Sequence, residues 1–123
     1  MAKKLQRGSV RTDREPKIPP QVRIAGKTYT VEVVNPDTRE LVEGYNAGYI
    51  SHQRQCIYLN GAYHPDQIRD TLLHEIIHGC EEAFGFQAPE EYVHALASIL
   101  LGVLKDNPEV VEYILKEGEN NDD

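Results

Sequence analysis

The first part of the chain alternates hydrophobic and polar residues, which is the pattern of β-strands. Residues 22–24 and 28–34 alternate on either side of a turn at 25–27, and this arrangement predicts a β-hairpin. A second pair of short strands, joined by a polar turn, is predicted at 47–51 and 55–59. The pattern therefore predicts a small antiparallel sheet of about four strands.

The second part of the chain changes to helical spacing of its hydrophobic residues. Pro65 is well placed as the first residue of a helix, and Gly85 is a natural stop for it. A second helix is predicted from Glu90 to Lys105, and a short third helix is predicted to start at Pro108. Strands followed by helices indicate an α+β fold, in which the sheet is backed by the first helix.

The length and composition indicate one soluble globular domain. The chain has 123 residues, of which 40% are hydrophobic and 27% charged. No apolar run reaches the roughly 18 residues of a membrane span, and the N-terminus lacks the apolar core of a signal peptide. We therefore predict a cytoplasmic protein with no membrane partner. Cys56 and Cys80 are expected to be reduced there.

The charge is distributed unevenly along the chain. The net charge is −7, yet the first 17 residues carry six Lys or Arg side chains: Lys3, Lys4, Arg7, Arg11, Arg14 and Lys17. We predict a disordered basic leader at 1–18, a folded domain at 19–116 and a disordered acidic tail at 117–123. The acidic body argues against nucleic-acid binding by the fold itself, so only the basic leader is a candidate for such contacts.

The most informative motif is His74-Glu75-Ile76-Ile77-His78, which has the form HExxH. Two histidines four residues apart lie about 40° apart around a helix, so both imidazoles can bind one zinc ion. Glu75 lies about 100° from His74, where it can take a proton from a water held by that ion. We therefore predict His74 and His78 as metal ligands, Glu75 as the general base and one Zn²⁺ per chain.

A catalytic zinc site needs a third protein ligand and one open position. Glu82 is excluded because it lies about 12 Å from His74 along the helix axis. The second helix is the expected donor, and Glu90 faces its core side most nearly, ahead of Glu91 and His94. Glu90 is therefore the predicted third ligand, with Glu91 and His94 as alternatives.

Two acidic residues lie about one helical turn from the histidine face. Glu81 and Asp70 can each reach the second nitrogen of a ligand imidazole and hold the ring in place. Histidines that bind zinc commonly have such a partner, but the spacing alone does not choose between these two residues.

Residues 57–59, the helix segment 71–78 and the later Glu90 together resemble a known family. The chain is similar to the ImmA/IrrE-type zinc metallopeptidases, and closer to their short single-domain versions in phages and prophages. That family has a TLxHE helix after a strand and a later helix that begins with a ligand glutamate. Val93, His94 and Leu96 depart from the residues the family has after that glutamate. The resemblance covers roughly residues 20–110, and it implies a minimal zincin-like fold with Glu90 as third ligand.

The leading functional prediction is a zinc-dependent peptidase that hydrolyses a peptide bond in a protein or peptide substrate. The strand before the HExxH helix would offer an edge on which an extended substrate can pair. The alternative is a zinc-stabilised module of phage or prophage origin that binds a protein and cleaves nothing. A third possibility is a nucleic-acid accessory protein that acts through the leader. The sequence predicts no oligomeric state.

Overall fold

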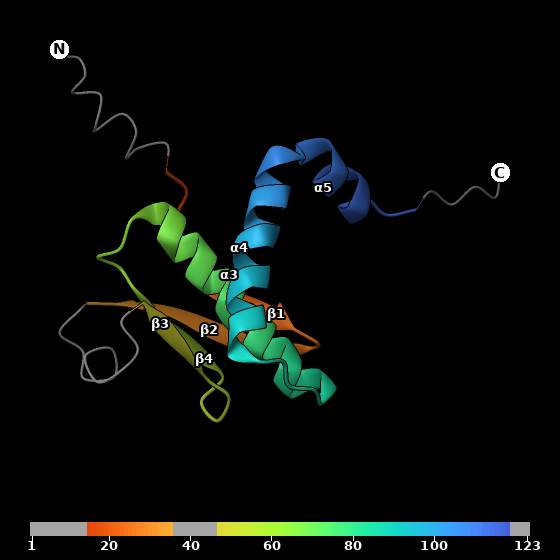
Figure 1. The fold of residues 1–123 in the computed structure, drawn as a ribbon. Coiled ribbons are helices and arrows are strands. Elements are labelled where there is room, and N and C mark those ends of the chain that lie inside the picture. The colour runs from red at the N-terminus through yellow and green to blue at the C-terminus, as the bar shows by residue number, and fades with distance from the viewer. Residues whose placement is uncertain (1–14, 36–46, 119–123) are drawn as a thin grey trace, which may run out of the picture.

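The sheet contains four strands in the order β1-β2-β4-β3 (Figure 1). The structure is a computed structural model that describes residues 15–35 and 47–118. The strands are β1 (Gln21–Ile24), β2 (Lys27–Val34), β3 (Gly48–Ser51) and β4 (Cys56–Asn60). The two predicted hairpins are present, because β1 pairs with β2 and β3 pairs with β4, both antiparallel.

The prediction that the whole sheet is antiparallel is wrong, since β2 and β4 are parallel. The second hairpin adds to the first through β4, and β3 is left at the edge of the sheet. The burial of β4 accounts for this order of strands. Four of its five residues are buried, and a strand buried on both faces belongs between two neighbours.

Three helices follow the sheet, and their bounds agree with the prediction to within a residue or two. They are α3 (Pro65–Phe84), α4 (Glu90–Asp106) and α5 (Pro108–Leu115). The side chain of His64 caps α3 by accepting a hydrogen bond from the Asp66 N–H at 3.1 Å. Gly85 ends α3 in the left-handed conformation with φ 71°. The α+β class is thus confirmed.

The core lies between the sheet and α3. Buried residues of β1, β2 and β4 meet side chains that recur every four residues along α3: Ile24, Tyr29, Val31, Ile57 and Leu59 from the sheet, and Ile68, Leu72, Ile76 and Cys80 from the helix. The next helix, α4, packs mainly on α3, and α5 packs on α4 (Figure 1). The layers are therefore sheet, α3 and α4, and the HExxH helix is the middle one.

The segment just before β1 contacts the folded body. Ile18 packs against the core cluster, and Glu15 forms an ion pair with Arg69 of α3. The rest of the predicted leader, and residues 119–123 of the predicted tail, lie outside the described residues. No helix in the described parts of the chain combines the length and hydrophobicity needed to cross a bilayer.

Candidate metal centre

His74 and His78 lie side by side on α3, as their spacing predicts. Their ring centroids are 4.8 Å apart and their Nε2 atoms 3.1 Å apart. The side chains of His74 and His78 keep 15% and 23% of their surface exposed. Both histidines therefore present the same nitrogen to one point that solvent can reach.

Glu90, the first residue of α4, brings its carboxylate to that same point. Its Oε2 lies 2.9 Å from His74 Nε2, and its Oε1 lies 3.1 Å from His78 Nε2. These ligand atoms all lie within 4.8 Å of one another, which makes the three residues a group able to hold a metal ion.

The spacing of the three ligand atoms fits a tetrahedral ion. Bonds of about 2.0–2.1 Å to such an ion place neighbouring ligand atoms about 3.3 Å apart. The observed separations of 2.9 to 3.1 Å are a few tenths of an ångström shorter. Two histidines and one carboxylate leave the fourth tetrahedral position open. The side chain of Glu90 is 68% exposed, so this residue lies on the solvent side of the group.

The two alternatives to Glu90 do not belong to this group. Among the described residues, the group able to hold an ion comprises His74, His78 and Glu90. His94 lies one turn further along α4, with its ring centroid 6.0 Å from that of His74. Glu91 is exposed, and the cavity beside the histidines is not lined by it. Of the three candidates, Glu90 is thus the one whose carboxylate lies with the two histidines.

Glu81 holds the ring of His78 in position. Its Oε1 accepts a hydrogen bond from His78 Nδ1 at 2.8 Å, and its Oε2 accepts one from the Ala88 N–H at 2.8 Å. Because Nδ1 carries the proton, Nε2 of His78 has a lone pair free for a cation. Asp70, the other residue predicted for this role, instead accepts a hydrogen bond from Ser98 of α4.

Glu75 is buried immediately beside the metal-binding group. Only 7% of its surface is exposed, and this burial raises the pKa of its carboxyl group to about 7. The nearby His78 opposes the rise in pKa, whereas the negative charge of Glu90 adds to it. A carboxyl group with a pKa near neutrality accepts a proton and gives it up again at little cost, as a general base must.

The two histidines have different pKa shifts for different reasons. Burial lowers the pKa of His74, against the opposing effect of Glu90. Burial also acts to lower the pKa of His78, but its hydrogen bond to Glu81 and the charges of Glu75 and Glu90 outweigh burial and raise it. His78 is thus the more electron-rich of the two ligands, because a carboxylate supports its second nitrogen.

A cavity of about 520 Å³ adjoins the group. Its lining comes from β3, α3 and the start of α4: Ala47, Gly48, Tyr49, Ile50, Gln67, Asp70, Thr71, His74, Glu75, His78, Glu90 and His94. The volume is within the range of about 300–1,000 Å³ that is usual for ligand sites. One wall of the cavity is therefore a strand and the opposite wall is the start of a helix.

The prediction that an extended substrate can pair with the edge of the strand before the HExxH helix is wrong, because that strand has a neighbour on each side. That strand is β4, which has β2 on one side and β3 on the other. The N–H of Asn60 donates to the C=O of Ala47, so backbone groups of Gly48 and Ile50 point away from β4 in the alternating antiparallel pattern. The edge next to the cavity is that of β3.

Comparisons of this chain with models of protein families, with curated proteins and with solved structures gave no match. The resemblance to ImmA/IrrE-type peptidases therefore remains a prediction from the residues quoted above. The candidate site rests on the geometry of this chain alone.

Proposed function

We propose that this protein is a zinc-dependent peptidase of the ImmA/IrrE type that hydrolyses a peptide bond in a protein or peptide. The observation that carries the proposal is the meeting of His74, His78 and Glu90 within 4.8 Å, next to the buried Glu75. Two histidines and a carboxylate favour zinc over magnesium or calcium, which prefer ligands made only of oxygen. Three ligands also leave the open position that hydrolysis requires.

The residues of the site divide the work of hydrolysis between them. Zinc in such a site supplies Lewis acidity, which lowers the pKa of a water molecule and polarises a carbonyl group. Glu75 accepts the proton of the attacking water and later delivers it to the leaving amine. His94 lines the same cavity, and its ring N–H is a suitable donor to the negative charge that develops on the carbonyl oxygen.

The substrate we propose is an extended segment of polypeptide. The outward backbone groups of Gly48 and Ile50 are spaced to pair with such a segment as an added strand. Pairing along β3 would place the segment against the cavity that holds His74 and Glu75. Main-chain pairing of this kind sets the position of a scissile bond without demanding a particular side chain.

Glu75→Gln tests the role of Glu75 as the base. We expect the variant to keep its zinc and its fold but to lose at least about a hundredfold of the hydrolysis rate, the lower end of general-base contributions. The measurement is cleavage of a dye-quenched unfolded protein by wild type and variant at equal zinc content. Glu82→Gln is the matched control, because Glu82 is an exposed glutamate of the same helix and should leave the rate unchanged.

Equal cleavage rates in wild type and Glu75→Gln would contradict the proposal. A wild-type protein that holds zinc and binds unfolded polypeptide, but cleaves none, would instead favour the zinc-stabilised binding module. The two functions are thus separated by turnover, while zinc content is common to both.

A further inference from the structure

The side of α4 that faces away from α3 is hydrophobic. Between Glu91 and Lys105 the helix carries no charged residue. Val93 and Ala97 are buried, at 1% and 0% exposure, on the side that packs against the body. A surface helix normally has polar residues opposite its buried face, and a helix that is hydrophobic all round is covered on all sides. We therefore expect a partner to cover the exposed hydrophobic face of α4.

Four large side chains form a regular row on that exposed face. Tyr92, Leu96, Ile99 and Val103 are 64%, 46%, 61% and 47% exposed. At 3.6 residues per turn they fall within about 60° of one another. We call these four residues the outer row. Their spacing is that of a helix seam that packs against another helix.

The short helix α5 also leaves its hydrophobic side chains exposed to solvent. None of its eight residues is buried, and four hydrophobic side chains are exposed: Val110 at 48%, Tyr113 at 81%, Ile114 at 67% and Leu115 at 75%. In Figure 1, α5 runs from the far end of α4, away from the sheet. A helix this short is unstable in water without tertiary packing. Its hydrophobic side chains thus extend the area that a partner would cover.

The exposed area matches what a dimer needs. The outer row and the four side chains of α5 are eight large residues. At roughly 100 Å² each they present about 800 Å², which is the area one partner contributes to a standard-size interface. Scattered single hydrophobic residues on a surface need no explanation, but four in a regular row along one helix face indicate an interaction site.

The outer row is complementary to itself. Its residues are separated by four, three and four positions, which reads the same in both directions. A second α4 running antiparallel would therefore set Tyr92 against Val103 and Leu96 against Ile99, twice over, about one two-fold axis. No charged side chain lies within the row, so this pairing buries no unpaired charge. These properties suit a copy of the same chain.

We propose that two copies of this protein associate through the outer row and α5 to form a symmetric homodimer. The proposal does not depend on zinc or on peptidase activity, because it rests on the hydrophobic faces alone. Since α4 begins with Glu90, the second copy would also cover the helix that carries this carboxylate to the candidate metal centre.

Sedimentation of the 123-residue protein at tens of micromolar tests the dimer. We expect the wild type to have twice its chain mass of 13.9 kDa. Ile99→Glu places a charge in the middle of the outer row and should give a monomer with unchanged helical circular dichroism. Phe84→Glu is the matched control, because Phe84 is 68% exposed but lies at the end of α3, and this variant should remain a dimer.

If Ile99→Glu fails to fold, the milder Ile99→Ser replaces it and should raise the dimer dissociation constant at least tenfold. A monomeric wild type, or a dimer that survives Ile99→Glu in folded form, would overturn the proposal. A monomer that binds phosphatidylcholine vesicles through the outer row would assign this face to a lipid surface instead. Assembly that continues beyond two copies would also contradict the closed, two-fold pairing.

Discussion

One carboxylate, that of Glu81, connects the candidate metal centre to the link between α3 and α4. It accepts hydrogen bonds from His78 Nδ1 and from the Ala88 N–H, both at 2.8 Å. These two bonds hold the pKa of Glu81 below its usual value, with the Ala88 bond first. Glu81 thus fixes both the ring of one ligand and the chain just before Glu90.

Loss of this carboxylate should weaken metal binding while the ligands remain. For Glu81→Ala we predict zinc affinity 10–100-fold lower, the usual effect of removing the partner of a ligand histidine. Competition with a coloured chelator measures the affinity. Glu82→Ala, at the exposed neighbouring position, is the control. An unchanged affinity in Glu81→Ala would show that the ring of His78 needs no support.

Residues that share a helix could be placed from the sequence, because helix geometry fixes their relation. His74 and His78 meet as the four-residue spacing requires. Glu90 could only be ranked above Glu91 and His94, since its position depends on how α4 docks against α3. Glu81 could not be separated from Asp70 for a similar reason: both lie one turn away, and only the packing of Ser98 and Ala88 decides between them.

At the scale of elements, the edge strand β3 approaches α3 very closely at Gly48. A Cβ atom there would lie 2.5 Å from the C=O oxygen of Tyr58 and 2.9 Å from Thr71 Cγ2. The first contact is with backbone of the neighbouring strand and cannot be relieved by a rotamer change. The wall of the cavity therefore depends on a residue without a side chain.

Gly48→Ala should push β3 away from both β4 and α3 and destabilise the fold. We predict a loss of about 1–3 kcal/mol in the free energy of unfolding, the usual cost of overpacking. Urea denaturation measures it. Gly118→Ala is the control, because a Cβ atom at Gly118 would meet nothing within 4 Å and should change stability little. A Gly48→Ala variant as stable as the wild type would mean that β3 shifts freely.

The strands themselves were predictable from alternation, but their order was not. Each hairpin is a local feature with a short turn, so 22–34 and 47–59 reveal both. The parallel pairing of β2 with β4 joins residues some 26 positions apart, such as Thr30 and Cys56. Local pattern carries no information about such a pairing, which follows from burying β4 in the middle of the sheet.

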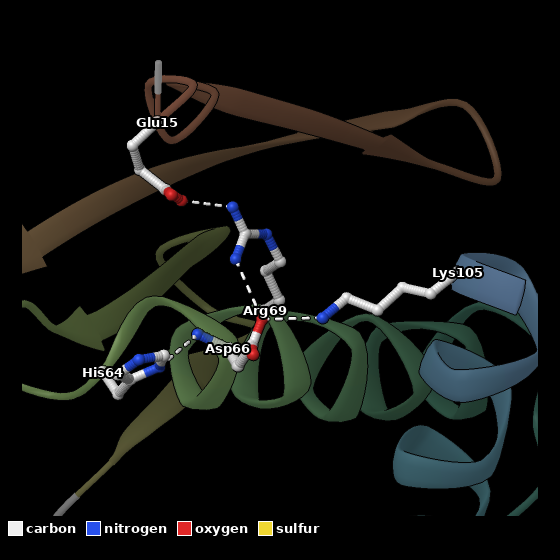
Figure 2. A network of polar contacts seen from close by, with 5 residues as sticks. All are labelled: Glu15, His64, Asp66, Arg69 and Lys105. Carbon is white, nitrogen blue, oxygen red and sulfur yellow. Dashed lines mark hydrogen bonds and ion pairs between the residues drawn. The ribbon is translucent and has the colours of Figure 1, made fainter. Parts of the chain in front are cut away.

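At the scale of the whole molecule, one polar network ties together three distant segments of chain (Figure 2). Asp66 in the first turn of α3 accepts hydrogen bonds from Lys105 of α4 at 2.7 Å and from Arg69 at 3.1 Å. Arg69 in turn pairs with Glu15, ahead of the sheet. The far end of α4 is thereby held to α3.

Asp66→Asn should lower the unfolding temperature at neutral pH and low salt. Lys105, with Arg69, holds the pKa of Asp66 below its usual value near 3.8. A carboxyl group with a lowered pKa stabilises the fold above its unfolded-state pKa, and this stabilisation is lost as pH falls through the folded-state pKa. The difference between variant and wild type should therefore disappear in strong acid, and it should shrink at high salt.

Thermal unfolding at pH 7, at acidic pH and at high salt measures this difference. Asp106→Asn is the control, because Asp106 is an exposed aspartate at the end of α4, and this variant should not lower the unfolding temperature at pH 7. A deficit in Asp66→Asn that persists unchanged in acid would contradict an electrostatic origin.

The zinc content of purified protein tests the central claim most directly. Inductively coupled plasma mass spectrometry should find about one zinc per chain in the wild type. It should find the same in His94→Ala, since His94 is not part of the ligand group. His74→Ala and Glu90→Ala should each lose most of it while remaining folded. Folded wild-type protein that takes up no zinc from a zinc-containing medium would contradict the account, and so would Glu90→Ala with full zinc occupancy.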